Sequence, residues 1–174
     1  YTLFPLQTTG EDPKAPKNKR WRETAYNPDL ERKDLPGAFG VLLKPDDLVI
    51  DVDPRRFEHP EDDQLAELWR KLGLGAIDTF IVNTASGGYH VYLKKPPELK
   101  LKSNKQIISE GYGALELKSF KRYSVGAGSK ILDNETQAWK RYTVRRGNPL
   151  FIADCPEPFL KWCESVIDTS VKEI

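Results

Sequence analysis

The stretch Leu48-Val-Ile-Asp-Val-Asp53 decides the fold and carries the most informative pair of side chains in the sequence. Its β-branched apolar residues are typical of a short strand, and the strand ends in acids. Alternate side chains of a strand share a face, so Asp51 and Asp53 project together. The apolar run Phe39–Leu43 precedes this stretch, and the turn at Pro45-Asp-Asp lies between the two. The pattern predicts a β-hairpin formed by residues 39–43 and 48–53.

Outward from this stretch, the sequence predicts further short strands and two helices. The clearest hairpin joins Thr79–Thr84 to Tyr89–Leu93 through the turn Ala85-Ser-Gly-Gly. Apolar residues at helical spacing predict helices over Glu61–Leu72 and Pro156–Val171. The other predicted strands are the pair Ala114–Lys118 and Arg122–Gly126, a strand within Trp139–Val144 and a short one at Gln106–Ser109.

Prolines and glycines break the first thirty-odd residues, which are predicted to be loop and turn. Beyond them, short strands joined by turns, with helices at separate places, indicate an α+β fold. We expect mostly antiparallel sheet flanked by helices. A chain of 174 residues suits a single domain.

Composition excludes several classes of protein. Charged residues make up 30% of the chain, and no run approaches the roughly 20 apolar residues that a membrane span needs. Aromatic residues make up 10%, which argues against disorder. Two Cys and two His cannot supply a credible four-ligand zinc site. No signal peptide is recognised, so the cytoplasm is the expected location, and the start at Tyr1 suggests part of a longer protein.

The net charge of +1 conceals a separation of signs along the chain. Basic residues gather within 14–22, 94–105, 118–122 and 140–146, and acidic residues within 46–53 and 58–63. Such separation allows a basic face for phosphates beside an acidic pocket for cations. On charge alone, a solvated mixed surface is the simpler interpretation.

Three short motifs carry candidate chemistry, and the first is the pair Asp51 and Asp53. Two carboxylates held close together repel each other, and a cation between them relieves the repulsion. Their oxygens suit Mg²⁺ or Mn²⁺. The alternative is a solvent-facing strand end, which a bare pair of acids would favour.

The second motif is Thr84-Ala-Ser-Gly-Gly-Tyr-His90. Gly87 and Gly88 permit a tight turn whose exposed backbone N–H groups can cradle phosphate oxygens. His90 follows at the start of the next strand, where its imidazole could donate to a phosphate. The alternative is an ordinary hairpin with a partly buried histidine.

The third motif is Glu116 with Lys118 in Ala114-Leu-Glu-Leu-Lys. Their spacing places both on the polar face of a strand, as a metal ligand beside a cation for a triphosphate. The alternative is an exposed ion pair that contributes little to stability.

In this order the three motifs resemble the bifunctional primase-polymerase (prim-pol) family of the archaeo-eukaryotic primase superfamily. The resemblance extends to Lys14-Ala-Pro16 and Trp21, and to Tyr123-Ser-Val-Gly-Ala-Gly-Ser129, where the family more often has Pro than Gly. It covers roughly residues 3–148. The chain departs from the family at Glu116, where Asp is more usual, and it lacks ligands for the zinc-binding insertion of some relatives.

The resemblance implies an RRM-like catalytic core that transfers nucleotides on a template. It implies two divalent ions, Mg²⁺ or Mn²⁺, held by Asp51, Asp53 and Glu116. It implies a triphosphate site whose candidate residues are Ser86, Gly87, Gly88, His90 and Lys118, with Arg122 and Ser129 added by their neighbourhood.

The resemblance also implies partners and a domain organisation. The expected partners are a single-stranded DNA template or primer, and dNTPs or NTPs, within a phage or plasmid replication protein. We expect residues 1–150 to form the catalytic domain. Residues 151–174 are expected to be a helix that packs on it or leads to a helicase-like module.

Two other functions remain open at this point. Carboxylate-bound ions beside a histidine serve a metal-dependent nuclease or phosphoesterase equally well. A non-catalytic module that binds single-stranded DNA could keep the same fold. In the primase-polymerase interpretation, Tyr112, Phe120 or Tyr123 could stack on a base of the template, although aromatic residues in strands more often belong to the core.

Overall fold

The computed structural model describes residues 2–17, 21, 37–56, 63–101 and 111–171, and in its last helix side chains are described to residue 165. A five-stranded sheet forms its centre, in the order β10-β4-β5-β3-β6, with every neighbouring pair antiparallel. Its strands are β3 (Asp47–Val52), β4 (Ile81–Asn83), β5 (Tyr89–Lys94), β6 (Leu115–Lys118) and β10 (Thr143–Arg146).

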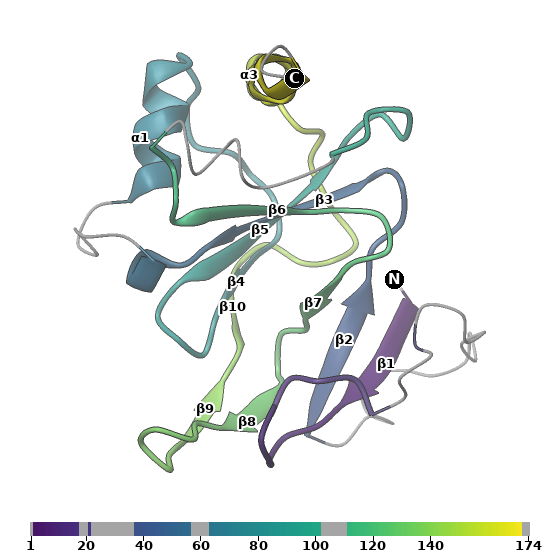
Figure 1. The fold of residues 1–174 in the computed structure, drawn as a ribbon, viewed down its shortest axis with the longest axis vertical. Coiled ribbons are helices and arrows are strands. Elements are labelled where there is room, and N and C mark those ends of the chain that lie inside the picture. Colours follow the sequence, from purple (N-terminus) through teal and green to yellow (C-terminus); the bar gives the residue numbers. More distant parts are fainter. Residues whose placement is uncertain (1, 18–20, 22–36, 57–62, 102–110, 172–174) are drawn as a thin grey trace.

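Two smaller sheets lie on one side of this central sheet (Figure 1). One has the order β1-β2-β7, from β1 (Thr2–Leu6), β2 (Ala38–Leu42) and β7 (Tyr123–Val125). The other pairs β8 (Lys130–Leu132) with β9 (Trp139–Arg141). The helices α1 (Gln64–Lys71) and α3 (Glu157–Val171) lie on the opposite side, and a 3-10 turn, η2 (Pro54–Arg56), follows β3. The predicted α+β fold with antiparallel sheets and flanking helices is confirmed.

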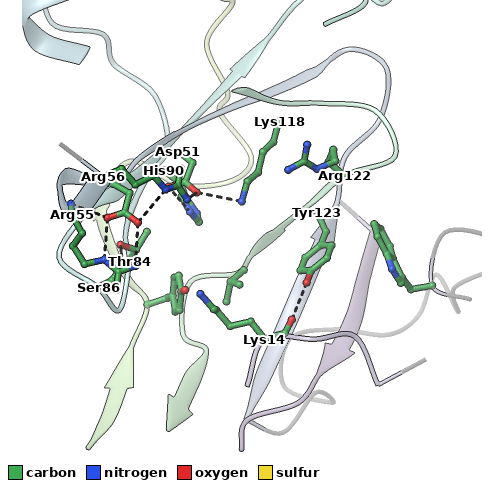
Figure 2. A pocket seen from close by; sticks show the side chains of 14 residues that line it. Lys14, Asp51, Arg55, Arg56, Thr84, Ser86, His90, Lys118, Arg122 and Tyr123 are labelled. Atoms are coloured by element: carbon green, nitrogen blue, oxygen red, sulfur yellow. Dashed lines mark hydrogen bonds and ion pairs between the residues drawn. The ribbon is translucent and has the colours of Figure 1, made fainter. Parts of the chain in front are cut away.

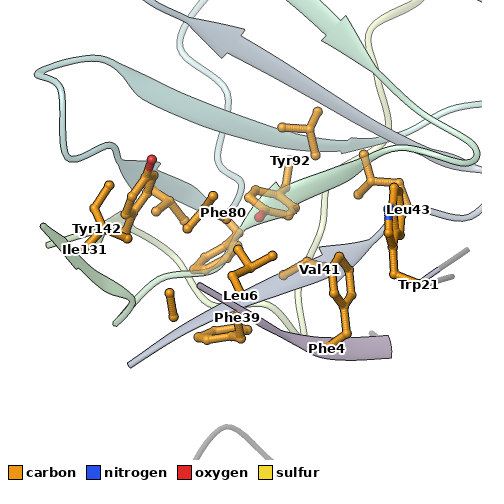
Figure 3. Packing of buried hydrophobic residues seen from close by; sticks show 14 residues of the cluster. Phe4, Leu6, Trp21, Phe39, Val41, Leu43, Phe80, Tyr92, Ile131 and Tyr142 are labelled. Carbon is orange, nitrogen blue, oxygen red and sulfur yellow. The ribbon is translucent and has the colours of Figure 1, made fainter. Parts of the chain in front are cut away.

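Alternation along β3 sends its side chains into two separate cores. Leu48, Ile50 and Val52 face the helices, where they pack with residues such as Trp69 and Phe159. Val49 faces the other way, into the core between the sheets. Figure 3 shows this second core, where Phe4, Leu6, Phe39 and Val41 of the β1-β2-β7 sheet meet Phe80, Tyr92 and Tyr142. Asp51 lies on the same face as Val49, so it opens toward the space between the sheets.

Strands that were predicted correctly do not all have the predicted partners. Residues 39–43 and 48–53 do not form a hairpin: β2 pairs with β1 and β7, whereas β3 pairs with β5 and β6. The turn between them carries the chain from one sheet to the other. Asp47 holds this turn, because its carboxylate accepts from the Lys44 amide at 2.8 Å and from the Lys94 ammonium at 2.6 Å.

The same change of sheet occurs twice more. The predicted pair 114–118 and 122–126 consists of β6 in the central sheet and β7 in the three-stranded sheet. The predicted strand within 139–144 is divided between β9 and β10, which also belong to different sheets. The first residues are not all loop, because Thr2–Leu6 forms the edge strand β1, where Pro5 is tolerated.

The hairpin of residues 79–84 and 89–93 and both helices are confirmed. β4 pairs with β5 in the register Val82 opposite His90. In α1, the side chain of Asp63 caps the N-terminus by accepting from the Ala66 amide at 3.0 Å. The predicted strand at 106–109 lies outside the described residues. No helix among the described residues is long and apolar enough to cross a membrane.

Candidate active site

The register of the central sheet brings residues of all three motifs into one row. Asp51 of β3 lies opposite His90 of β5 on one side and opposite Glu116 of β6 on the other. Directly opposite residues of antiparallel strands present their side chains on the same face. Lys118 lies two residues beyond Glu116 on that face, and its ammonium is 3.3 Å from the Asp51 carboxylate. The three motifs, which are far apart in the sequence, are therefore neighbours in space.

Asp53 follows the end of β3, where its amide donates to the Ala114 carbonyl at 2.9 Å. The chain then turns through η2, which begins at Pro54, whose fixed φ suits a helical first position. The turn returns Arg55 toward Asp53: its amide and its Nε both donate to Oδ1 at 3.1 Å, and its Nη2 lies 3.1 Å from Oδ2. Arg55 thus holds both oxygens of Asp53.

Arg56 contacts the side chains of all three acidic residues, Asp51, Asp53 and Glu116. Its Nη1 donates to Glu116 at 3.2 Å, its Nε lies 3.6 Å from Asp53, and its Nη2 lies 4.0 Å from Asp51. Arg122 contacts the other oxygen of Glu116, at 2.6 Å. Together with Arg55 and Lys118, four cationic side chains contact the three carboxylates.

These contacts lower the pKa values of both aspartates. Burial of the Asp51 carboxyl raises its pKa, but the hydrogen bond and charge of His90, then Lys118 and Arg56, outweigh burial and hold it far below its usual range. Burial likewise raises the pKa of Asp53, and the hydrogen bonds and charges of Arg55, with Arg56, lower it overall. Both groups are therefore ionised at neutral pH.

The turn between β4 and β5 lies against the end of β3. The Thr84 hydroxyl accepts from the Gly88 amide at 3.0 Å, and the Thr84 amide donates to the Gly88 carbonyl at 3.0 Å. Gly87 has φ +90°, which favours glycine. A Cβ on Gly88 would overlap the carbonyl oxygen of Val52, so the absence of a side chain there lets the turn approach β3. Ser86, at the tip of the turn, lies 3.3 Å from the Thr84 hydroxyl.

These groups surround a cavity of about 250 Å³ (Figure 2). Its lining combines five cations with two carboxylates, His90, two small hydroxyl residues, three aromatic rings and a valine. The lining residues are Lys14, Trp21, Asp51, Asp53, Arg55, Arg56, Thr84, Ser86, His90, Lys118, Arg122, Tyr123, Val125 and Tyr142. The excess of cationic side chains favours an anion such as a phosphate chain.

His90 is almost fully buried, and its two ring nitrogens differ. Nε2 lies 3.5 Å from Asp51 Oδ1, whereas Nδ1 has no hydrogen-bond partner among the described residues. A buried polar atom without a partner is costly unless a ligand or water satisfies it. His90 lines the cavity, so a ligand there is a suitable partner for this nitrogen.

The remaining predicted site residues lie at different distances from the cavity. Glu116 borders it through Arg56 and Arg122, and Gly87 and Gly88 form the turn that carries Ser86. Ser129 is fully buried and its hydroxyl accepts from the Phe39 amide at 3.1 Å, so it links the chain before β8 to β2. It is not among the described residues that line the cavity.

Sequence reasoning did not single out Arg55, Arg56 or Tyr142. The two arginines could have been found, because they follow the acidic motif directly after a proline that starts a turn. Tyr142 gives no such signal, since it reaches the cavity from the short link between β9 and β10. Of the predicted stacking aromatics, Tyr123 lines the cavity, whereas Tyr112 packs edge-to-face on Trp162 at the helix side of the sheet.

The described residues contain no ready-made group of three or more His, Cys, Asp or Glu side chains that could hold a metal ion as they stand. The donor chemistry nevertheless fits a hard divalent ion, because three carboxylates converge on one position. In this structure the cation at that position is the Arg56 guanidinium, with one nitrogen toward each carboxylate. A metal site here therefore requires Arg56 to move and the carboxylates to close in.

The chain matches a known protein family. A family model described as "Bifunctional DNA primase/polymerase, N-terminal" matches residues 1–158, which is most of the chain. Comparison with curated proteins gives no match. The matched region contains every residue of the row, the turn and the cavity described above. Family membership supports nucleotidyl transfer of the primase/polymerase type in general. The chain belongs to the bifunctional DNA primase/polymerase (Prim-Pol) family.

Proposed function

We propose that this chain performs template-directed nucleotidyl transfer as the DNA primase, the DNA polymerase, or both, of a phage or plasmid replication protein. In this reaction a 3′-hydroxyl attacks the α-phosphate of an incoming nucleoside triphosphate, and pyrophosphate leaves. The observation that carries the proposal is the convergence of Asp51, Asp53 and Glu116 beside a cavity rich in cations, in a Prim-Pol family member.

Asp51, Asp53 and Glu116 would hold two divalent ions, Mg²⁺ or Mn²⁺. Such ions, when bound, lower the pKa of the attacking hydroxyl and neutralise the charge of the leaving phosphates. Asp51 and Asp53 are ionised and can therefore act as ligands of such ions, because the pKa of each carboxyl lies below its usual range. Glu116 keeps the same charge as the more usual Asp and reaches one methylene further.

The triphosphate would lie along the cationic side of the cavity. Ser86 and His90 line it, and Nδ1 of His90, which has no hydrogen-bond partner in the part of the chain that the structure describes, is a candidate donor to a phosphate oxygen. The cations Lys118 and Arg122 complete the proposed set. The amides of Gly87 and Gly88 donate to Thr84 within the turn, so each would have to exchange that partner for a phosphate oxygen in order to join the set. The place of Ser129 in this set stays a prediction from the family resemblance.

The proposed partners are a single-stranded DNA template with or without primer, and dNTPs or NTPs. Residues 1–150 are the proposed catalytic domain, and α3 packs on it. A helicase-like module is the proposed neighbouring domain, and the host cytoplasm is the proposed location. Binding to the template backbone would be independent of sequence and weakened by salt.

One gel assay tests the activity. The chain is incubated with single-stranded template, with and without an annealed primer, with Mg²⁺ or Mn²⁺ and with dNTPs or NTPs. Asp51→Asn removes a proposed ligand while keeping the shape of the side chain. Asp78→Asn is the matched control, because the Asp78 side chain is 88% exposed and pairs with Arg146, away from the cavity.

We expect triphosphate-dependent products from the wild type and from Asp78→Asn, and a loss of about a thousandfold or more for Asp51→Asn. Products in unprimed lanes would assign priming as well as extension. Shortening of the template without added triphosphates would instead support a metal-dependent nuclease. Template binding without products in any lane would favour the non-catalytic binding module.

A further inference from the structure

The three carboxylates of the proposed metal site already surround a cation that belongs to the chain itself. Arg56 directs Nη1 to Glu116 at 3.2 Å, Nε to Asp53 at 3.6 Å and Nη2 to Asp51 at 4.0 Å. We propose that Arg56 is an internal placeholder for the divalent ion: it occupies the position among the carboxylates and must leave before a metal binds. This inference rests on the proposed function.

The position of Arg56 differs from that of the other cations of the site. Arg55 contacts Asp53, Arg122 contacts Glu116, and Lys118 contacts Asp51. Each of these lies at the side of one carboxylate. Among the described residues, Arg56 is the side chain that contacts all three. Arg55, Arg122 and Lys118 can stay in place when a metal ion replaces Arg56 among the three carboxylates.

The contacts of Arg56 are those of a cation held mainly by charge. Its contact with Glu116 has hydrogen-bond geometry, whereas the distances to Asp53 and Asp51 are longer than a hydrogen bond. The side chain is 43% exposed and extends from a three-residue turn at the surface. Ion pairs of this kind contribute little each, and a long exposed side chain can swing into solvent.

A placeholder has a physical purpose in this site. Without a cation at the centre, the three carboxylates would repel one another across the ends of β3 and β6. A guanidinium relieves that repulsion in the metal-free chain. It is larger than Mg²⁺ or Mn²⁺, whose oxygen ligands lie at roughly 2.0–2.2 Å, so it holds the carboxylates further apart than a metal would. Metal binding must then displace Arg56, which lowers the apparent metal affinity of the free chain.

The test measures Mn²⁺ binding by the 174-residue chain without nucleotide or DNA. Electron paramagnetic resonance reports the free Mn²⁺, so the readout does not depend on catalysis. The variants are Arg56→Gln, the matched control Arg55→Gln, the single variant Asp51→Asn, and the double variant Asp51→Asn with Arg56→Gln. Arg55→Gln removes the same charge from the neighbouring residue but empties no central position.

We expect Arg56→Gln to bind Mn²⁺ about tenfold more tightly than the wild type, which corresponds to about 1.4 kcal/mol. Arg55→Gln should gain no more than about twofold, and the double variant should lose the gain because a ligand is missing. Circular dichroism checks the fold of each variant. Should Arg56→Gln fail to fold, Arg56→Lys replaces it, since a lysine keeps the charge but cannot span three carboxylates, and a gain of about threefold is expected.

Two results would overturn the inference and leave the metal site standing. In the first, Arg56→Gln and the wild type bind Mn²⁺ equally, and Asp51→Asn abolishes binding in both. In the second, Arg55→Gln gains as much as Arg56→Gln, which would make total charge rather than position responsible. If Arg56→Gln binds no more Mn²⁺ than the double variant, the carboxylates form no metal site, and the proposed function fails together with the inference.

Discussion

At the scale of single residues, Asp51 is held by attraction rather than strained by repulsion. From the sequence alone, the two neighbouring carboxylates are expected to repel each other. In the structure, Asp51 contacts His90 at 3.5 Å and Lys118 at 3.3 Å, and Arg56 lies between it and the other acids. The local balance of charge therefore favours the ionised carboxylate.

This balance predicts the stability of Asp51→Asn in metal-free buffer. We expect the variant to be less stable than the wild type by about 1–2 kcal/mol at neutral pH, because Lys118 and His90 lose an ionised partner. The pKa of Asp51 is depressed in the folded chain, so its contribution is complete above the ordinary value of 3.8 and is lost as the pH falls below it. Urea unfolding at pH 7, 4 and 3 should show the gap between the two proteins narrowing with acid. Asp78→Asn is the control, and a gap that widened with acid would contradict the argument.

At the scale of elements, the β4–β5 turn must lie close to the end of β3 for Ser86 and His90 to reach the cavity. Gly88 permits this approach and Gly87 provides the left-handed conformation of the turn. Gly87 and Gly88 are therefore required for different physical reasons, and substitution of each by alanine can distinguish between these reasons.

We expect Gly88→Ala to destabilise the chain by about 3 kcal/mol, because its Cβ would overlap the Val52 carbonyl and push the hairpin away from β3. Gly87→Ala meets no atom within 4 Å. Its cost is the left-handed backbone alone, about 1 kcal/mol. Thermal unfolding should show a drop of roughly 6–12 °C for Gly88→Ala and roughly 2–4 °C for Gly87→Ala. Equal drops would mean that the turn does not depend on its contact with β3.

The elements also show what sequence can and cannot predict here. Periodicity found the strands, because alternation and turn residues act locally: the hairpin through Gly87 and Gly88 and the helix over Gln64–Lys71 are both present. It failed on the partners of β2 and β6, because nothing local distinguishes a turn within a sheet from a crossing between sheets. Pairing depends on which faces must be buried, and β3 needs a core on both faces.

Local sequence patterns likewise predict some residues of the candidate site and miss others. Acids two residues apart on a strand and a Gly-Gly turn before a histidine are local patterns, so the sequence singled them out. Arg56 contacts Asp51 and Asp53 through a turn of three residues, and reaches Glu116 sixty residues away through the sheet register. Such convergence is a property of the folded sheet, and no spacing in the sequence reports it.

At the scale of the whole molecule, the helices support the site from behind. Asp51 projects from one face of β3, and Ile50 and Val52, its neighbours in sequence, pack on the other face beneath α1 and α3. Phe159 of α3 is completely buried and lies 4.8 Å from Trp69 of α1, ring to ring. The helix expected to lie outside the catalytic domain thus shares the core on the helix side of the central sheet, and the boundary at residue 150 stays a prediction.

A pair of phenylalanines eight residues apart tests whether α3 belongs to the same folding unit as the site. Phe159→Ala should cost about 3–5 kcal/mol, because it leaves a cavity between the helices and the central sheet. Phe151→Ala is the matched control: Phe151 is 74% exposed, so the same deletion should change stability by less than about 0.5 kcal/mol. Tryptophan fluorescence during urea unfolding reports the helix core through Trp69 and Trp162 once Trp21 and Trp139, which lie outside that core, are replaced by Phe. A second background that keeps Trp21 as the single tryptophan reports the core between the sheets. We expect both signals to shift to the same lower urea concentration in Phe159→Ala, since β3 contributes to both cores and loses its support as one unit. Loss of the helix-core transition alone, with the transition of the core between the sheets unchanged, would mean that α3 folds as a separate element and that the catalytic sheet stands without it.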